Sequence, residues 1–323
     1  MLTKRLIAGS LMAAGIGAIL LGDAVISDAL RLPFYPFLFF FALAAGYLAT
    51  RELVSIIPQP NRPLRWACAV GVLLMLGSHF VQAAVQQFAH DRWHDGLHEW
   101  DPQQWKLPAY VSGGFILFAF LVEMYRYRAT GHSVTKVAHS LFVFAYLGVL
   151  PSFFLKLRWL VFDDPAEPGK LLPNTTGLML ALTIFVPKCC DIAAYFVGRF
   201  FGRIQAVPLL SPKKTWAGFI GGFIGAAAAA VILMLIGRAQ GREVFAFGWV
   251  EAILFGVTLG FVGILGDLAE SLIKRDANAK DSAQTVPGFG GLLDVFDSVL
   301  FAGPVAYLWF NGQYWLATRF GAG

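Results

Sequence analysis

Long apolar runs alternate with short polar connections along almost the whole chain. A helix needs about 17 to 25 mostly apolar residues to cross the hydrocarbon core of a bilayer. Runs of that length predict nine membrane-spanning helices, at about residues 6–22, 33–50, 66–86, 108–125, 137–155, 171–187, 216–237, 247–265 and 291–311. The expected fold is therefore all-α, that of a polytopic integral membrane protein.

The predicted spans fall into two groups. About five of them lie in an N-terminal region, residues 1–170. The others lie in a C-terminal region, residues 171–323, which also carries two polar loops at 188–215 and 266–290. Any chemistry is expected in this second region, because the polar loops hold most of its charged residues.

The distribution of basic residues predicts the orientation. The first run follows Lys4 and Arg5, but no clear small-x-small cleavage site comes after it, which favours a first membrane anchor over a signal peptide. Sixteen of the 25 Lys and Arg residues lie at the N-terminus and in the alternate loops on its side. Because cationic loops stay in the cytoplasm, we expect the N-terminus and both polar loops there, by default at a bacterial inner membrane.

Composition agrees with a membrane protein and excludes other classes. Hydrophobic residues make up 57% of the chain and charged residues 14%, against roughly 45 to 50% and 25% in soluble domains. The formal net charge of +5 is too small, and too scattered, for a nucleic-acid-binding protein. Three cysteines, two of them adjacent, exclude a disulfide framework.

The stretch from Gly266 to Ser298 departs most from its surroundings, because charged residues crowd between two apolar runs. Charge beside lipid is costly, and chains that keep it usually use it. Four polar residues in it follow helical spacing and would share one stripe of a continuous helix: Asp267, Glu270, Ser271 and Lys274. A solvated, salt-bridged helix end is the alternative interpretation.

A glycine-rich turn at 287–291 follows, and Asp294 and Asp297 come directly after it, one helical turn apart. Glycines let the backbone adopt a positive φ and approach a ligand closely. Two carboxylates at this spacing suit a hard cation such as Mg²⁺, which binds one or two carboxylates together with phosphate oxygens. Alternatively, a nearby cation neutralises the pair without metal, the candidates being Lys274, Arg275 and Lys280.

The earlier polar segment predicts an anion site. Asp191 and Tyr195 open it, and SPKKT, residues 211–215, closes it just before an apolar run. Ser and Thr are good helix N-caps, so this end would present free backbone N–H groups together with Lys213 and Lys214. The same lysines would also serve as ordinary cytoplasmic anchors.

On the opposite side of the membrane, His90, His94 and His98 recur every four residues. This spacing is compatible with a transition metal. Gly96 weakens the helix, however, and the tryptophans nearby are typical of an amphipathic segment on the membrane surface. Both interpretations stay open.

These motifs together resemble the phosphatidate cytidylyltransferases, also called CDP-diacylglycerol synthases. Their signature is matched by Ser271, Leu272, Ile273, Lys274, Arg275, Lys280, Asp281, Pro287, Gly290, Gly291, Asp294 and Asp297. The upstream segment is similar as well, at Asp191, Ala194, Tyr195, Gly198, Gly202 and residues 211–218. The N-terminal spans resemble the family only in being hydrophobic.

The resemblance implies transfer of CMP from CTP to phosphatidate, a membrane lipid, with release of pyrophosphate and CDP-diacylglycerol. It implies Mg²⁺, at two ion positions, on Asp267, Asp294 and Asp297. It implies that substrates are neutralised or oriented by Lys274, Arg275, Lys280 and Asp281. It implies nucleotide and substrate contacts at Asp191, Tyr195, Ser211, Lys213, Lys214, Thr215, Gly290 and Gly291. A homodimer is compatible with this interpretation.

Two alternatives remain. Phe289 and Val295 stand where the family usually has His and Arg, and Ala217 where an acid is frequent, which keeps open a cytidylyltransferase acting on a different lipid phosphate. An ion-coupled secondary transporter would place acids near mid-membrane in two related halves. Here the acids gather beside one membrane face and no repeat is visible, which favours the enzyme.

Overall fold

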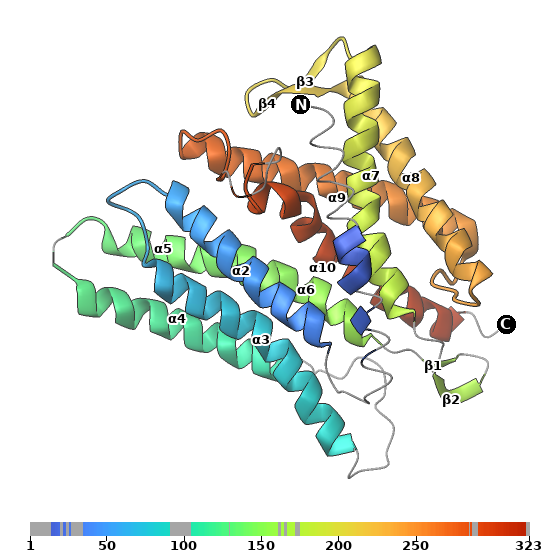
Figure 1. Cartoon of the computed structure of the whole chain (residues 1–323), viewed down its shortest axis with the longest axis horizontal. Helices are drawn as coiled ribbons and strands as arrows, with labels where there is room; N and C mark the ends of the chain where they lie inside the picture. The colour runs from blue at the N-terminus through green and yellow to red at the C-terminus, as the bar shows by residue number, and fades with distance from the viewer. Residues whose placement is uncertain are drawn as a thin grey trace. The chain divides into compact units, whose positions relative to one another are not determined.

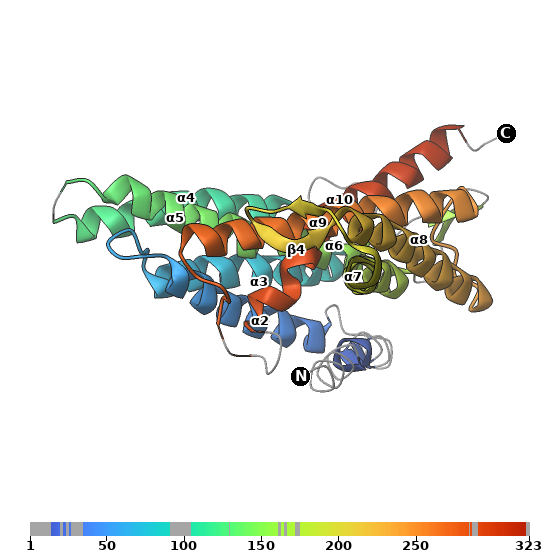
Figure 2. The ribbon, with the colours of Figure 1, turned by 90° about the horizontal axis from the view of Figure 1, so that it is seen from above.

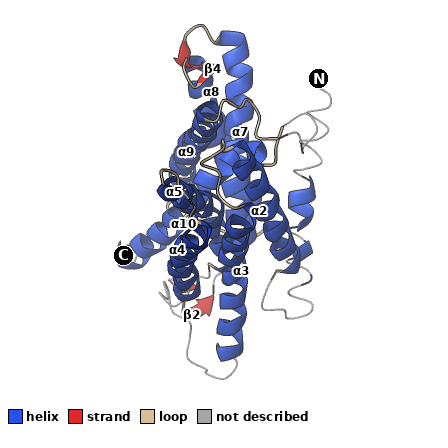
Figure 3. Cartoon of the chain, turned by 90° about the vertical axis from the view of Figure 1, so that its left-hand side faces the viewer, coloured by secondary structure: helices blue, strands red, loops and turns tan. Residues whose placement is uncertain are grey.

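The computed structural model describes residues 14–19, 22–23, 26, 35–90, 105–128, 130–160, 163–164, 167–171, 175–283, 285 and 290–320. Within these residues, eight helices are long and apolar enough to cross a membrane. Figure 3 shows that helices dominate and that the described strands form only two short hairpins. The all-α polytopic membrane fold is therefore confirmed. The span expected at residues 6–22 lies largely outside the described residues and stays a prediction.

The chain divides into two compact units, and both are discontinuous in sequence. Unit 1 comprises Met1–Leu155 together with Ala277–Val295. Unit 2 comprises Lys156–Asp276 and Phe296–Gly323. The segment that carries the glycine-rich turn thus belongs with the N-terminal helices.

In unit 1, four helices run alongside one another in Figure 1: α2 (Pro36–Ile56), α3 (Arg65–His90), α4 (Lys106–Arg126) and α5 (Ser133–Phe144). A π-helical turn, Ala145–Val149, joins α5 to α6 (Leu150–Lys156), so that the chain continues as one span. At the start of α2, the buried carboxylate of Asp23 accepts hydrogen bonds from the backbone N–H groups of Phe37 (2.8 Å) and Leu38 (2.7 Å). Asp23 thereby satisfies donors that a helix N-terminus leaves unpaired.

Stacked aromatic rings form one cluster in the core of unit 1. The rings of Phe115 on α4 and Phe144 on α5 stack with centroids 4.4 Å apart, and Met75 of α3 packs against them. A side chain at Gly71 of α3 would collide with the Phe115 ring. The absence of that side chain lets α3 and α4 approach closely.

Unit 2 contains η3 (Leu157–Trp159), β1 (Asp163–Asp164), β2 (Glu167–Leu171), α7 (Thr176–Phe201), β3 (Gln205–Val207), β4 (Ser211–Thr215), α8 (Trp216–Ala239), α9 (Gly248–Asp276) and all but the first residues of α10 (Leu293–Phe320). Both strand pairs are antiparallel. Figures 1 and 2 show α7 and α8 side by side, with α9 packed against both. Glycines allow this packing: a Cβ at Gly222 of α8 would lie 2.9 Å from the Cys190 Sγ of α7.

The earlier polar segment is more helical than expected. Residues 188–201, predicted as loop, extend α7. Residues 266–276 extend α9, as the helical spacing of the polar residues there indicated. Continuing the helix keeps each backbone N–H and C=O paired as the chain leaves the membrane. Gly202 then ends α7, and Asn278, whose φ of 53° is left-handed, follows the end of α9. The candidate residues Asp191, Asp267 and Glu270 therefore stand on helices instead of loops.

Candidate functional site

Three carboxylates meet in unit 2. Asp267 and Glu270 project from α9 and Asp297 from α10, and each offers an oxygen within 4.8 Å of the others. Glu270 is 1% exposed and Asp297 is 7% exposed. Buried carboxylates at this distance repel one another and lose hydration, so the group requires positive charge nearby. We call these three residues the carboxylate cluster.

Small residues in α9 make the cluster possible. A Cβ at Gly266 would lie only 2.5 Å from the backbone carbonyl oxygen of Asp297 and 3.1 Å from Ser298 Cα. At Gly263, one turn earlier, a Cβ would lie 2.8 Å from Pro187 Cβ of α7. The backbones of α7, α9 and α10 therefore converge at this point, which brings Asp267 and Asp297 together.

Lysines supply the positive charge, and each member of the cluster has one. Lys214 Nζ lies 2.8 Å from Asp267 Oδ2, and Lys274 Nζ lies 2.8 Å from Glu270 Oε2. Lys188 Nζ of α7 lies 3.3 Å from Asp297 Oδ1. The lysines come from three different elements, so the site joins α7, β4, α9 and α10.

Asp191 belongs to the same network, because its Oδ2 lies 3.6 Å from Lys188 Nζ. Lys188 thus stands between Asp191 and Asp297. Tyr195, one turn further along α7, is exposed and accepts a hydrogen bond of 3.1 Å from Arg199 Nη1. The structure brings Asp191 to the cluster but gives Tyr195 no described contact with it.

The β3–β4 hairpin positions Lys214. Successive side chains of a strand point to opposite faces, and accordingly Lys213 is exposed whereas Lys214 reaches Asp267. Thr215 is the N-cap of α8, as the sequence predicted: its Oγ1 accepts a hydrogen bond of 3.1 Å from the Gly218 N–H. Ser211, also expected at a helix cap, instead begins β4 and pairs with Val207, because residues 211–215 form a strand before α8 begins. The hairpin and the cap fix the lysine relative to α8.

In unit 1, Asp294 organises the glycine-rich turn. Its Oδ2 accepts hydrogen bonds from the Gly291 N–H (2.6 Å), the Ser282 hydroxyl (2.8 Å) and the Ser282 N–H (3.2 Å). Gly290 has a φ of 102°, which confirms the expected left-handed backbone in this turn. These hydrogen bonds tie Asp294 to the glycine-rich turn and to Ser282 before it, and its role as a metal ligand stays a prediction.

Glu52 of α2 completes the turn and was missed by sequence reasoning. Its carboxylate is 5% exposed and accepts hydrogen bonds from the N–H groups of Leu292 (3.0 Å) and Leu293 (2.9 Å). The hydroxyls of Ser282 and Thr285 also donate to it. An acid at the N-terminus of α10 satisfies free N–H groups and favours the helix dipole.

Lys188 was also missed as a site residue. Lys188 lies three residues before Asp191 on one helix, and this spacing was the available sequence signal. Nothing in the sequence indicated its second partner, Asp297. For Glu52, the signal was an isolated acid next to an apolar run, without any indication of its partners.

The other predicted residues are solvent-facing or undescribed. Arg275, Lys280 and Asp281 are exposed. The three histidines of the predicted metal spacing, with the exception of the backbone of His90, lie outside the described residues, as does Phe289. Their roles stay predictions.

The carboxylate cluster fits a divalent cation. Its donors are hard oxygens from three side chains already within reach of one centre, which is the ligand type that Mg²⁺ prefers. Glu270 and Asp297 are held in place by burial as well as by their lysines. The sequence had predicted Asp267 and Asp297 for this role together with Asp294, and the structure adds Glu270, one turn from Asp267 on α9.

Comparison with known proteins gives the family. The sequence model of the cytidylyltransferase family matches residues 3–312. The chain is 30% identical over 276 residues to the phosphatidate cytidylyltransferase of Chlamydia pneumoniae, covering 83% of this chain and 80% of the relative. It is 33% identical over 214 residues to that of a Synechocystis strain, covering 61% and 68%.

A plant relative matches over a shorter region. The chain is 35% identical over 187 residues to the chloroplastic phosphatidate cytidylyltransferase 4 of Arabidopsis thaliana, covering 53% of this chain and 45% of the relative. A second Arabidopsis thaliana relative, phosphatidate cytidylyltransferase 5, is covered to 49%, so the chain spans about half the length of these two proteins. Since the family model covers most of the sequence, the chain belongs to the cytidylyltransferase family.

Proposed function

We propose that the chain transfers CMP from CTP to phosphatidate, giving CDP-diacylglycerol and pyrophosphate. Membership of the cytidylyltransferase family supports the nucleotidyl transfer, and similarity to phosphatidate cytidylyltransferases supports the lipid acceptor. The observation that carries the proposal is the carboxylate cluster with its three lysines, a combination that suits a metal-bound triphosphate.

The cluster would hold Mg²⁺ through Asp267, Glu270 and Asp297. When bound, the ion would neutralise triphosphate oxygens and stabilise charge that develops during transfer. Asp294 is retained as the candidate ligand of a second ion. The three carboxylates stand on helices, which keeps their geometry fixed before substrate arrives.

The lysines would bind phosphate. Lys214, on the hairpin, and Lys188, on α7, approach the cluster from two different elements, so they suit oxygens on either side of the transferred phosphorus. Lys213, exposed beside Lys214, would bind the outer phosphates. The Thr215 hydroxyl, at the positive end of the α8 dipole, adds a neutral donor for the same anion.

In the reaction, an oxygen of the lipid phosphate forms a bond to the α-phosphorus of CTP. The bond between the α-phosphorus and the bridging oxygen breaks, and that oxygen leaves with pyrophosphate. A phosphate monoester is already deprotonated near neutral pH, so the protein needs no general base. Its contribution is to position the two phosphates in line and to neutralise them.

We further propose that the site faces the cytoplasm, where CTP is available, and that phosphatidate stays in the bilayer. Sixteen of the 25 basic residues on the predicted cytoplasmic side support this orientation. A different lipid phosphate is the second candidate acceptor. It is favoured by Val295 and Phe289, which stand where the family pattern has Arg and His.

The test is incubation of the purified protein with radiolabelled CTP, Mg²⁺ and one phosphorylated lipid at a time. Phosphatidate should carry label into the lipid phase, and the other lipid phosphates in the panel should carry less. Label that appears only with another lipid phosphate would show that this lipid, and not phosphatidate, is the acceptor. No labelled lipid with any acceptor would overturn the nucleotidyl transfer itself.

Asp297→Asn tests the cluster. The change removes one ligand charge and should lower incorporation by about a thousandfold or more, because metal stabilisation of the transferred phosphoryl group accounts for several kcal/mol. Glu243→Gln is the matched control, since Glu243 is an exposed acid paired with Arg238 outside the cluster. Equal rates in both variants would remove Asp297 from the mechanism.

A further inference from the structure

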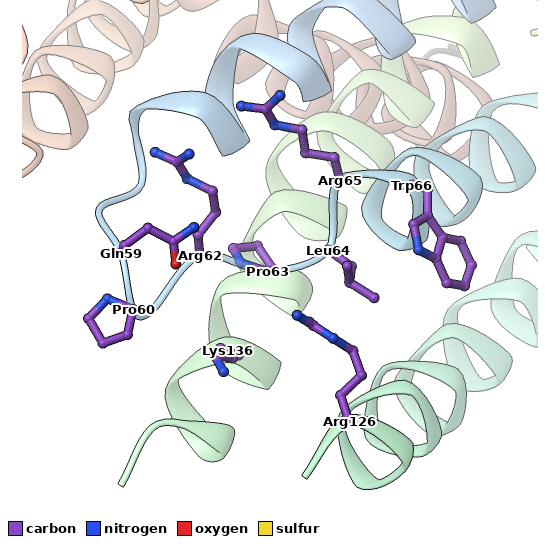
Figure 4. A pocket seen from close by; sticks show the side chains of 9 residues that line it. All are labelled: Gln59, Pro60, Arg62, Pro63, Leu64, Arg65, Trp66, Arg126 and Lys136. Atoms are coloured by element: carbon purple, nitrogen blue, oxygen red, sulfur yellow. The ribbon is translucent and has the colours of Figure 1, made fainter. Parts of the chain in front are cut away.

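A basic cavity of about 560 Å³ lies in unit 1, at the ends of its helices. It is lined by the α2–α3 connection, the first residues of α3, the last residue of α4 and the first turn of α5 (Figure 4). Its cationic side chains are Arg62, Arg65, Arg126 and Lys136. None of these residues belongs to the carboxylate cluster.

Four cations surround the cavity, and one buried acid is paired with two of them. Glu123 is 6% exposed, and its two oxygens lie 3.8 Å from Arg126 Nη1 and 3.6 Å from Lys136 Nζ. Among the described residues, no acid pairs with Arg62 or Arg65. One carboxylate cannot neutralise four cations, so the cavity keeps a net positive charge that favours an anion.

The cavity wall is fixed before any ligand binds. Arg62 donates from Nε to the Ile57 carbonyl oxygen and from Nη2 to the Ser55 carbonyl oxygen, both at 2.7 Å. Asn61 ties the same connection to α5: its side-chain oxygen lies 3.0 Å from His132 Nδ1, and its carbonyl oxygen lies 3.1 Å from His139 Nδ1. Basic residues that serve only as cytoplasmic anchors do not need such hydrogen bonds. The hydrogen bonds therefore distinguish this cavity from a set of unrelated surface cations.

An apolar track leaves the cavity along α3. Trp66, which lines the cavity, is followed at helical spacing by Val70 and Leu74, and the three are 55%, 41% and 57% exposed. Residues four apart share one helix face, so these side chains form a continuous strip on a membrane-spanning helix. A free phosphate ion would make no contact with this strip. The acyl chain of a lipid whose headgroup occupies the cavity would pack against it.

We propose that this cavity binds the phosphate of an anionic membrane phospholipid, whose acyl chain lies along the Trp66–Val70–Leu74 strip. Arg65 and Arg126 contact the phosphate oxygens, and Arg62 and Lys136 add long-range attraction. Basic pockets between membrane helices recognise headgroups in this way. The bound lipid is a ligand distinct from the acceptor of the transfer reaction and does not depend on that reaction.

The test uses the full chain in detergent and counts bound lipids by native mass spectrometry. The probe is phosphatidylglycerol, whose phosphate is a diester and therefore offers no acceptor for CMP transfer. Phosphatidylcholine is the zwitterionic comparison. Phosphatidylglycerol should bind saturably to the wild-type chain, and Arg65→Gln should weaken binding about fivefold, the attraction of one cation near a lipid surface.

Arg128→Gln is the matched control. Arg128 is exposed just beyond the end of α4 and does not line the cavity. It should change the affinity less than about twofold, since it adds only distant attraction. Equal losses in Arg65→Gln and Arg128→Gln, or no loss in either, would overturn the proposal, because a general basic surface makes no distinction between the two.

Two further arms complete the experiment. Arg65 has no described ion pair, so its removal should leave thermal unfolding unchanged and a loss of lipid would not reflect misfolding. Inorganic phosphate, added at increasing concentration, should not displace the lipid at concentrations comparable to the lipid. Displacement at such concentrations would overturn the lipid assignment in favour of a free-anion site.

Discussion

The carboxylate of Glu52 on α2 accepts a hydrogen bond of 2.9 Å from the backbone N–H of Leu293, 241 residues later in the chain. The same carboxylate also binds the N–H of Leu292 and two hydroxyls of the preceding segment. An N-terminal helix therefore holds the start of α10 and the glycine-rich turn in one conformation.

Glu52→Gln should loosen this turn. The amide NH₂ cannot accept a hydrogen bond, so one of the two backbone N–H groups loses its partner at a cost of about 1–3 kcal/mol. Hydrogen–deuterium exchange should increase at residues 290–293, and CMP transfer should fall about tenfold or more. Glu243→Gln should change neither measurement. Unchanged exchange in the turn would show that Glu52 does not hold it.

Glu270→Gln should weaken metal binding. The change keeps the volume of the side chain but removes one of the three clustered charges. We expect the Mg²⁺ concentration for half-maximal activity to rise about tenfold or more. Electron paramagnetic resonance titration with Mn²⁺ measures the affinity directly. An unaltered Mn²⁺ affinity would leave Glu270 as a structural partner of Lys274 only.

Lys188→Met should have the opposite effect on metal affinity. Lys188 is paired with Asp297 and Asp191 and would compete with a bound cation for their oxygens. Without it the site is more negative, and Mn²⁺ should bind several-fold more tightly, a modest change because Lys188 and Asp191 are about one-third exposed and partly screened. When a chelator removes metal ions, the variant should unfold at a lower temperature than the wild type. Lys106→Met, at an exposed lysine of α4, should alter neither property.

Gly266→Ala should separate α9 from α10. The added methyl would lie 2.5 Å from a backbone oxygen of Asp297, and neither backbone can move without disturbing a helix. Overpacking of this kind costs about 1–3 kcal/mol. The melting temperature and Mn²⁺ affinity should both fall.

Gly113→Ala provides the comparison for this substitution. A Cβ at Gly113 of α4 meets no atom within 4 Å, so alanine should be neutral or stabilising by up to about 1 kcal/mol. A wild-type melting temperature and metal affinity in Gly266→Ala would mean that the helices adjust and that close approach is not needed for the cluster.

Local features of the fold were predictable from sequence. Apolar run length located the eight described spans, because a bilayer imposes one length on every crossing helix. The cap at Thr215 and the left-handed Gly290 also followed from residue type, since both depend on local backbone geometry. The helical extension at 188–201 was missed because its polar residues resemble those of a loop.

The partners of the charged residues were less predictable. Asp294 and Asp297 lie one turn apart and looked equivalent, yet one binds the glycine-rich turn and the other binds Lys188. Which face of a helix meets which neighbour depends on packing over long sequence distances, and spacing within one helix does not encode it. The contacts of Glu52 are the extreme case.

The order in which a ribosome makes this chain gives the Glu52–Leu293 contact a further meaning. Glu52 is synthesised 241 residues before its partner, so the N-terminal helices enter the membrane with a carboxylate whose N–H and hydroxyl donors are not yet made. Only when residues 277–295 emerge can unit 1 be completed. A chain broken off before that point lacks the segment that completes unit 1 and the donors that the Glu52 carboxylate binds in the finished protein.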